Sequence, residues 1–70
     1  MIEIWRTIDG FPDYSISTLG NVRSDKSGRI LSLFENQSGL LMVGVMRDGT
    51  QWHRSVPLLV ARAFLAKPTK

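Results

Sequence analysis

Cysteine is absent from this chain of 70 residues, and histidine occurs only once. The absence of cysteine excludes disulfides and thiolate metal sites, so one hydrophobic core has to stabilise a chain near the lower size limit for folding. Apolar runs are too short to cross a bilayer, and Glu3 and Arg6 interrupt the N-terminus where a signal peptide would be apolar. We therefore predict a single domain over residues 1–70, located in the cytoplasm.

Residue types that carry catalysis are scarce as well. His53 is the single histidine, and its simplest interpretation is a partly exposed strand residue. The six carboxylates are scattered over predicted loops and turns, and no zinc-binding, phosphate-cradling or nucleophile motif occurs. We predict that the chain is not an enzyme and has no catalytic residue, metal site or cofactor. A net charge of +3 permits contact with nucleic acid but does not identify a partner.

The chain does contain a series of β-strand patterns separated by turn residues. Residues 14–17 alternate apolar and polar side chains, residues 19–21 favour a tight turn, and residues 22–24 resume the alternation. This pattern predicts a hairpin. The polar residues and final glycine of residues 25–28 predict a second turn, of type I, and residues 29–34 then read as a third strand.

A second hairpin is predicted in the other half of the chain. Residues 40–46 form a β-rich run, and residues 51–56 form another. Between them, Asp48 and Gly49 occupy the two positions at which a tight hairpin turn favours this pair.

The last element has helical spacing. From Ser55 onward apolar residues recur every three or four positions, with Ser55 as the cap and Pro57 in the first turn. We predict two to three helical turns that end before Lys67. A helix this short has to pack on the sheet to be stable. The predicted fold class is therefore α+β: a small antiparallel β-sheet of hairpins, about five short strands, with one C-terminal helix packed on it.

The predicted core consists of the apolar and aromatic residues that these patterns turn inward. Large aromatic side chains matter most in so small a domain, because each buries a large area. Trp52 is the exception, since it could stack on a partner instead. The core list is Trp5, Ile8, Phe11, Tyr14, Ile16, Val22, Leu31, Val43, Val45, Val56, Leu59, Val60 and Phe64.

One run of residues carries a resemblance to a known family. It comprises Trp5, Ile8, Gly10, Phe11, Tyr14, Ile16, Ser17, Gly20, Val22, Arg23 and Ser24, followed by Leu59, Val60, Ala61 and Phe64. The run resembles the NUMOD-type DNA-binding domain that opens many phage and intron-encoded HNH homing endonucleases. In that family the HNH segment begins shortly after the final Phe, so we expect a binding domain without the catalytic segment. A phage origin would place it in the cytoplasm of the host cell.

The resemblance implies a partner, double-stranded DNA, and a role for basic residues. Arg23 matches the family pattern and is the best candidate for a phosphate contact, with Lys26 and Arg29 beside the same turn. An ordinary solvated surface is the alternative for this cationic corner. Arg47 and Arg54 complete the predicted DNA-binding set, which would act mainly on phosphates.

Departures from the family pattern motivate a second hypothesis. Leu40, Met42 and Met46 occupy the face opposite the predicted core face of their strand, where relatives often have polar or basic residues. With Trp52, they form a candidate protein-binding set, because methionine adapts well to partner surfaces. These side chains could equally enlarge a thin core.

Three functions remain after this comparison. The first is a non-catalytic phage-type binding protein whose partner is double-stranded DNA. The second is a phage-derived transcription regulator that binds and inhibits a host protein such as RNA polymerase. The third and weakest is a homodimer formed by pairing of the exposed strand.

Overall fold

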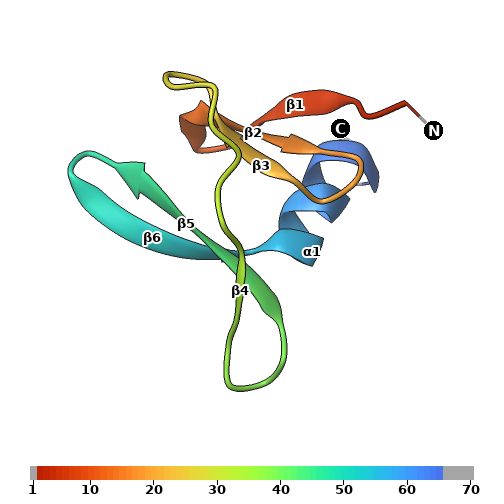
Figure 1. Cartoon of the computed structure of the whole chain (residues 1–70), viewed down its shortest axis with the longest axis vertical. Coiled ribbons are helices and arrows are strands. Elements are labelled where there is room, and N and C mark those ends of the chain that lie inside the picture. The colour runs from red at the N-terminus through yellow and green to blue at the C-terminus, as the bar shows by residue number, and fades with distance from the viewer. Residues whose placement is uncertain (1, 66–70) are drawn as a thin grey trace, which may run out of the picture.

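The computed structural model describes residues 2–65, which form six strands followed by a short helical segment (Figure 1). Two antiparallel sheets are present, with strand orders β1-β2-β3 and β4-β5-β6. The predicted α+β class is confirmed, although the strands form two sheets instead of one. The elements are β1 (Trp5–Ile8), β2 (Phe11–Ser17), β3 (Val22–Ser24), β4 (Phe34–Glu35), β5 (Leu41–Arg47), β6 (Thr50–Ser55), α1 (Val56–Val60) and the π-helical turn η1 (Ala61–Leu65).

The two hairpin turns that the sequence predicts lie where it predicts them, and a third tight turn at Asp9 and Gly10, between β1 and β2, was not predicted. Gly20 has φ 83° between β2 and β3, a left-handed value that favours glycine. Between β5 and β6, Arg47 pairs with Thr50 and leaves only two turn residues. These are Asp48 with φ 54° and Gly49 with φ 75°, the backbone of a type I′ turn.

The predicted third strand, residues 29–34, is wrong as a continuous element. Residues 29–31 lie beside β3, where Ile30 bridges Arg23 and the Leu31 N–H donates to the Val22 carbonyl at 2.8 Å. The chain then leaves this sheet and crosses to the other, where β4 pairs with the start of β5 (Figure 1). The six residues are therefore divided between two sheet edges, an arrangement that strand periodicity does not distinguish from one strand.

The predicted helix is confirmed over the described residues. The Ser55 side chain caps it by accepting a hydrogen bond from the Leu58 N–H at 3.4 Å, and Pro57 lies in the first turn. Helix α1 contacts β2, β5 and β6, so it covers the junction of the two sheets. The predicted end of the helix before Lys67 lies outside the described residues. No helix within residues 2–65 is long and apolar enough to span a membrane.

One core is shared by both sheets and the helix. Its eight buried apolar residues are Ile8, Phe11, Ile16, Val22, Val43, Val45, Val56 and Leu59, with the predicted members Tyr14, Leu31, Val60 and Phe64 packed around them. Trp5 is a wrong prediction, because it is half-buried and outside this cluster. It pairs with Ser17 and therefore faces away from Ile16, whose side chain enters the core from the other face of the sheet.

Substitutions at Ile16 and Trp5 should lower the free energy of unfolding by different amounts, because Ile16 lies in the core and Trp5 lies outside it. Ile16→Ala is expected to lower the free energy of unfolding by about 2–5 kcal/mol, because that side chain is fully buried. Trp5→Ala should cost less, about 1–2 kcal/mol, because much of the indole is already hydrated. Urea denaturation of both variants measures the two losses. A larger loss at Trp5 than at Ile16 would contradict this assignment of the core.

Candidate nucleic-acid interface

Two arginines and two aromatic rings form a cluster beside the β5–β6 hairpin. Within it, the Phe11 and Trp52 rings meet edge to face with centres 6.5 Å apart. The guanidinium carbon of Arg47 lies 5.0 Å from each ring centre, and that of Arg54 lies 5.3 Å and 5.1 Å from them. These distances are within the range of cation–π attraction, which holds both guanidinium groups against the rings. We call Phe11, Arg47, Trp52 and Arg54 the arginine–aromatic cluster.

Backbone contacts further restrict the arginines of this cluster. Arg47 Nη1 donates to the Gly10 carbonyl at 3.0 Å, and Arg54 Nη1 donates to the His53 carbonyl at 3.1 Å. Neither arginine forms an ion pair with any carboxylate of residues 2–65. Since a guanidinium has five N–H donors, each keeps donors for a ligand. The cluster therefore presents two oriented positive charges that no described side chain neutralises.

Trp52 contributes to this cluster through contacts of its ring. Its indole Nε1 is buried and reaches no acceptor among residues 2–65. The ring is therefore positioned by packing against Phe11 and by the two guanidinium groups, and not by a hydrogen bond from its Nε1 to residues 2–65. The prediction that Trp52 could stack on a partner has not been tested, but its half-buried ring already contacts Phe11.

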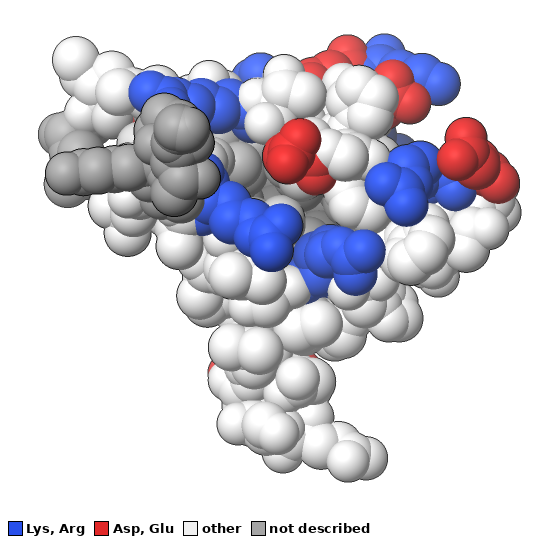
Figure 2. Space-filling view, turned by 180° about the vertical axis from the view of Figure 1, so that it is seen from behind, with Lys and Arg blue, Asp and Glu red and all other residues white. Residues whose placement is uncertain are grey.

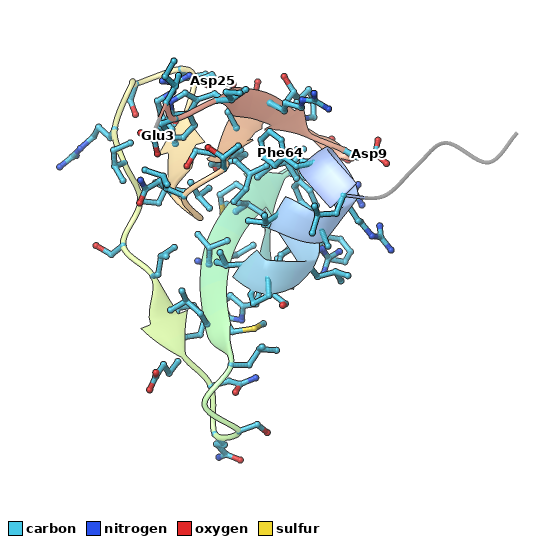
Figure 3. The ribbon with its side chains drawn as sticks, turned by 90° about the vertical axis from the view of Figure 1, so that its right-hand side faces the viewer. Glu3, Asp9, Asp25 and Phe64 are labelled. Carbon is cyan, nitrogen blue, oxygen red and sulfur yellow. The ribbon has the colours of Figure 1, made fainter. Side chains whose placement is uncertain are left out.

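Arg6 is a further positive charge that sequence reasoning missed. Its Nη1 donates to the Ala63 carbonyl at 2.9 Å, and its guanidinium carbon lies 5.1 Å from the Phe64 ring centre. Phe64 lies between β1 and the helical end (Figure 3). No local pattern could reveal this contact, because 57 positions separate Arg6 from Ala63. Figure 2 shows a face on which basic side chains lie next to one another, with acidic ones around them.

The predicted cationic corner is largely paired with acids. The guanidinium carbon of Arg23 lies 4.2 Å from the centre of the Trp5 ring, and its Nε lies 3.4 Å from Asp25 Oδ1. Lys26 Nζ lies 3.4 Å from Asp13 Oδ2. Exposed ion pairs contribute little to stability, but the carboxylates lower the positive potential that a phosphate would meet. Arg29, the third member, is exposed and forms no ion pair within residues 2–65.

Glu3 adds another negative charge near Arg23. Glu3 Oε2 accepts a hydrogen bond from Asn21 Nδ2 at 2.7 Å. Hydrogen bonds from Ser17 and Asn21, with the charge of Arg23 acting in the same direction, lower the pKa of Glu3 below its ordinary value. Glu3 and Asp25 lie at the same end of the molecule, opposite Asp9 (Figure 3). This end therefore carries mixed charge.

The predicted protein-binding set does not form one surface. Leu40 and Met46 are 39% and 47% exposed, and Met42 is half-buried. Trp52 pairs with Val45, so its side chain is on the opposite face of the sheet from Met42 and Met46. The grouping of Trp52 with the two methionines is therefore wrong, because strand register separates them.

His53 is an exposed strand residue, as predicted, and its ring meets Phe34 edge to face with centres 5.3 Å apart. Within residues 2–65, no group of three His, Cys, Asp or Glu side chains is arranged to hold a metal ion.

Comparison with known proteins places this geometry in a family. The NUMOD4 motif matches residues 3–45, more than half of the chain. This chain belongs to the NUMOD4 family. The resemblance found in the sequence is thereby confirmed. The motif includes Arg23, Lys26 and Arg29 but ends before Arg47 and Arg54, so the arginines of the cluster lie outside the matched NUMOD4 residues.

Two larger proteins show the same relationship. An uncharacterized HNH endonuclease of Acanthamoeba polyphaga mimivirus is 34% identical over all 70 residues, which span 21% of its length. The solved structure of the HNH homing endonuclease I-HmuI, which concerns DNA binding and cleavage, has a TM-score of 0.81 and 32% identity. That similarity covers 87% of this chain and 36% of I-HmuI. The NUMOD4 chain is therefore related to HNH endonucleases and corresponds to a minor part of each.

The lowered pKa of Glu3 predicts a pH dependence of stability. The ionised carboxylate is favoured in the folded state, so its contribution is present above the ordinary value of 4.5 and is lost as pH falls through the folded pKa. Glu3→Gln should therefore reduce the loss of stability on acidification. Urea denaturation at several pH values between pH 3 and pH 7 measures the free energy of unfolding and hence this loss. Glu35→Gln, in exposed β4, is the matched control, and an equal effect at both positions would refute a specific role for Glu3.

Proposed function

We propose that this chain binds double-stranded DNA and that the arginine–aromatic cluster contacts the phosphate backbone. The observation that carries the proposal is the pair of oriented guanidinium groups of Arg47 and Arg54, without a carboxylate partner in residues 2–65. Phosphate oxygens accept hydrogen bonds from guanidinium groups in a well-defined geometry, and such contacts set how a protein lies on a duplex.

The rigidity of the cluster supports this role. A flexible arginine loses conformational freedom when it binds a phosphate, whereas the rings of Phe11 and Trp52 already restrict these two. The β5–β6 hairpin also projects from the body of the molecule (Figure 1), which leaves its tip accessible to a large ligand. The mixed charge around Arg23 makes the corner proposed from sequence a weaker contact.

The relationship to HNH endonucleases supports DNA as the ligand. I-HmuI binds and cleaves DNA, and this chain shares a fold and 32% identity with about a third of it. We propose that these residues contribute binding and no cleavage. Incubation of the chain with plasmid DNA and Mg²⁺ tests that part separately, and nicking by the purified protein would overturn it.

Substitution of the cluster arginines tests the binding surface. Arg47→Ala and Arg54→Ala should each weaken binding to duplexes of any sequence, because a phosphate contact carries little base information. Each should also reduce the slope of log affinity against log salt concentration by about 0.9, the value for one phosphate contact. Fluorescence anisotropy with a labelled duplex at several salt concentrations measures both quantities.

Arg23→Ala is the matched control, because it removes the same charge from a site with a carboxylate partner. It should change affinity and slope less than either cluster variant. A larger effect at Arg23 would move the DNA contact to the corner predicted from the sequence. Binding that is weak and insensitive to salt in the unsubstituted chain would refute DNA as the ligand and favour a protein target, for which host RNA polymerase was the predicted example.

A further inference from the structure

One edge of β5 is only partly covered. Strand β5 (Leu41–Arg47) pairs with β6 along most of its length, but β4 pairs only with Leu41 and Met42 on the other side. From Gly44 onward this edge has no strand beside it within residues 2–65. An uncovered strand edge can accept an additional strand.

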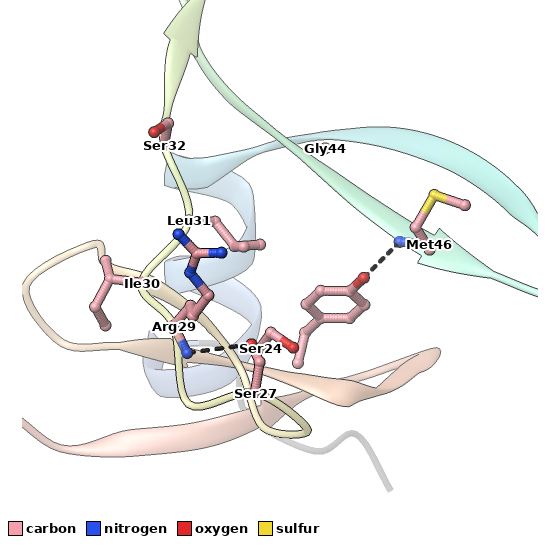
Figure 4. Close-up of a pocket in the computed structure, with 9 residues that line it drawn as sticks. Ser24, Ser27, Arg29, Ile30, Leu31, Ser32, Gly44 and Met46 are labelled. Carbon is pink, nitrogen blue, oxygen red and sulfur yellow. Dashed lines mark hydrogen bonds between the residues drawn. The ribbon is translucent and has the colours of Figure 1, made fainter.

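The hairpin register shows which backbone groups point toward the uncovered edge. Residues that flank a two-residue turn exchange hydrogen bonds, so the backbone of Arg47 faces β6 and that of Met46 faces the other way. The Met46 N–H confirms this direction, because it donates to the Tyr14 hydroxyl at 3.0 Å (Figure 4). By the same alternation, the N–H and carbonyl of Gly44 point toward the uncovered edge.

A groove of about 440 Å³ lies along this edge between the two sheets (Figure 4). The groove is open to solvent, and its lining is more polar than apolar. Its polar side chains are Arg29, the hydroxyl groups of Ser24, Ser27 and Ser32, and Tyr14, whose hydroxyl already accepts the hydrogen bond of the Met46 N–H. Its apolar members include Ile30 and Met46, which are 55% and 47% exposed. Arg29 forms no ion pair within residues 2–65, so the groove contains an uncompensated positive charge.

Gly44 has no side chain on the face of the sheet where its β6 neighbours Gln51 and His53 lie. A Cβ at this position would lie 2.8 Å from Gln51 Nε2, the far end of an exposed and flexible side chain that could move aside. Its φ is not left-handed either, unlike that of the turn glycines. Glycine within a strand often marks a place where another backbone approaches closely.

We propose that this groove binds an extended peptide segment of a partner protein, with a carboxylate side chain that pairs with Arg29. The peptide backbone would hydrogen-bond to the N–H and carbonyl of Gly44 and so extend the sheet by one short strand. Ile30 and Met46 would contact an apolar side chain of the same segment. One cation beside exposed apolar surface suits an acidic, apolar peptide better than a phosphate backbone, which is bound by several cations.

This site is separate from the proposed DNA contact. Arg47 and Arg54 project from the face of β5 and β6 that carries Val43 and Val45, whereas Met46 projects from the other face. The two proposed sites therefore share no residue, and the peptide proposal does not depend on the DNA proposal.

NMR titration of the ¹⁵N-labelled chain with the peptide acetyl-Val-Glu-Val-Glu-Val-amide tests the proposal. Saturable shifts are expected at the amides of Gly44 and its neighbours. The same peptide methylated on every backbone nitrogen should give no such shifts, because the methyl groups block both of its edges and it cannot pair with a strand edge. Arg29→Ala should weaken binding about two- to fivefold, as expected for one exposed ion pair.

Matched variants and ligands separate this result from the alternatives. The Arg47→Ala variant should bind the peptide with unchanged affinity. This variant therefore distinguishes failure of the peptide proposal from failure of the DNA proposal. Absence of shifts near Gly44, or equal binding of the methylated peptide, would overturn the proposal. Shifts of the same amides on addition of duplex DNA without peptide would overturn the proposal by assigning the groove to nucleic acid. Shifts that depend on protein concentration alone would overturn it by assigning the groove to a second copy of the chain.

Discussion

The packing of eight apolar side chains between two small sheets is the constraint on which the rest of the structure depends. Neither three-stranded sheet has a core of its own, because Ile16 and Val22 come from one sheet and Val43 and Val45 from the other. Helix α1 closes the junction with Val56 and Leu59. A chain of 70 residues has little area to bury, so the two sheets are stable only together. This shared core sets where every functional side chain lies.

Strand β5 shows how the core positions both proposed sites. Burial of Val43 and Val45 fixes the register and therefore the direction of each neighbouring group. On one side, this places Arg47 beside the carbonyl of Gly10 and the ring of Phe11. On the other side, it turns the backbone of Gly44 and Met46 toward the groove. A slip of one residue would bury polar groups and would remove both features at once.

Charge distribution depends on the same long-range packing. Arg23, Lys26 and Arg29 are close in the sequence and predict one basic corner, but the fold brings Asp13 to Lys26 and places Asp25 beside Arg23. The arginines of the cluster are seven positions apart, yet the hairpin and the ring of Trp52 between them make one surface. A modest net charge is thus compatible with a local concentration of positive charge.

The sequence by itself determined the local structure and the family. Gly20, the Asp48-Gly49 turn and the Ser55 cap act over a few residues, so their patterns predicted these two turns and the start of the helix correctly. The NUMOD-type pattern was equally visible in the chain, and the NUMOD4 match confirms it. Only the tertiary structure decided the division of residues 29–34 between two sheets, the position of Trp5 outside the core and the contact of Arg6 with Phe64. These features depend on which distant segments pack together, and local periodicity carries no information about that choice.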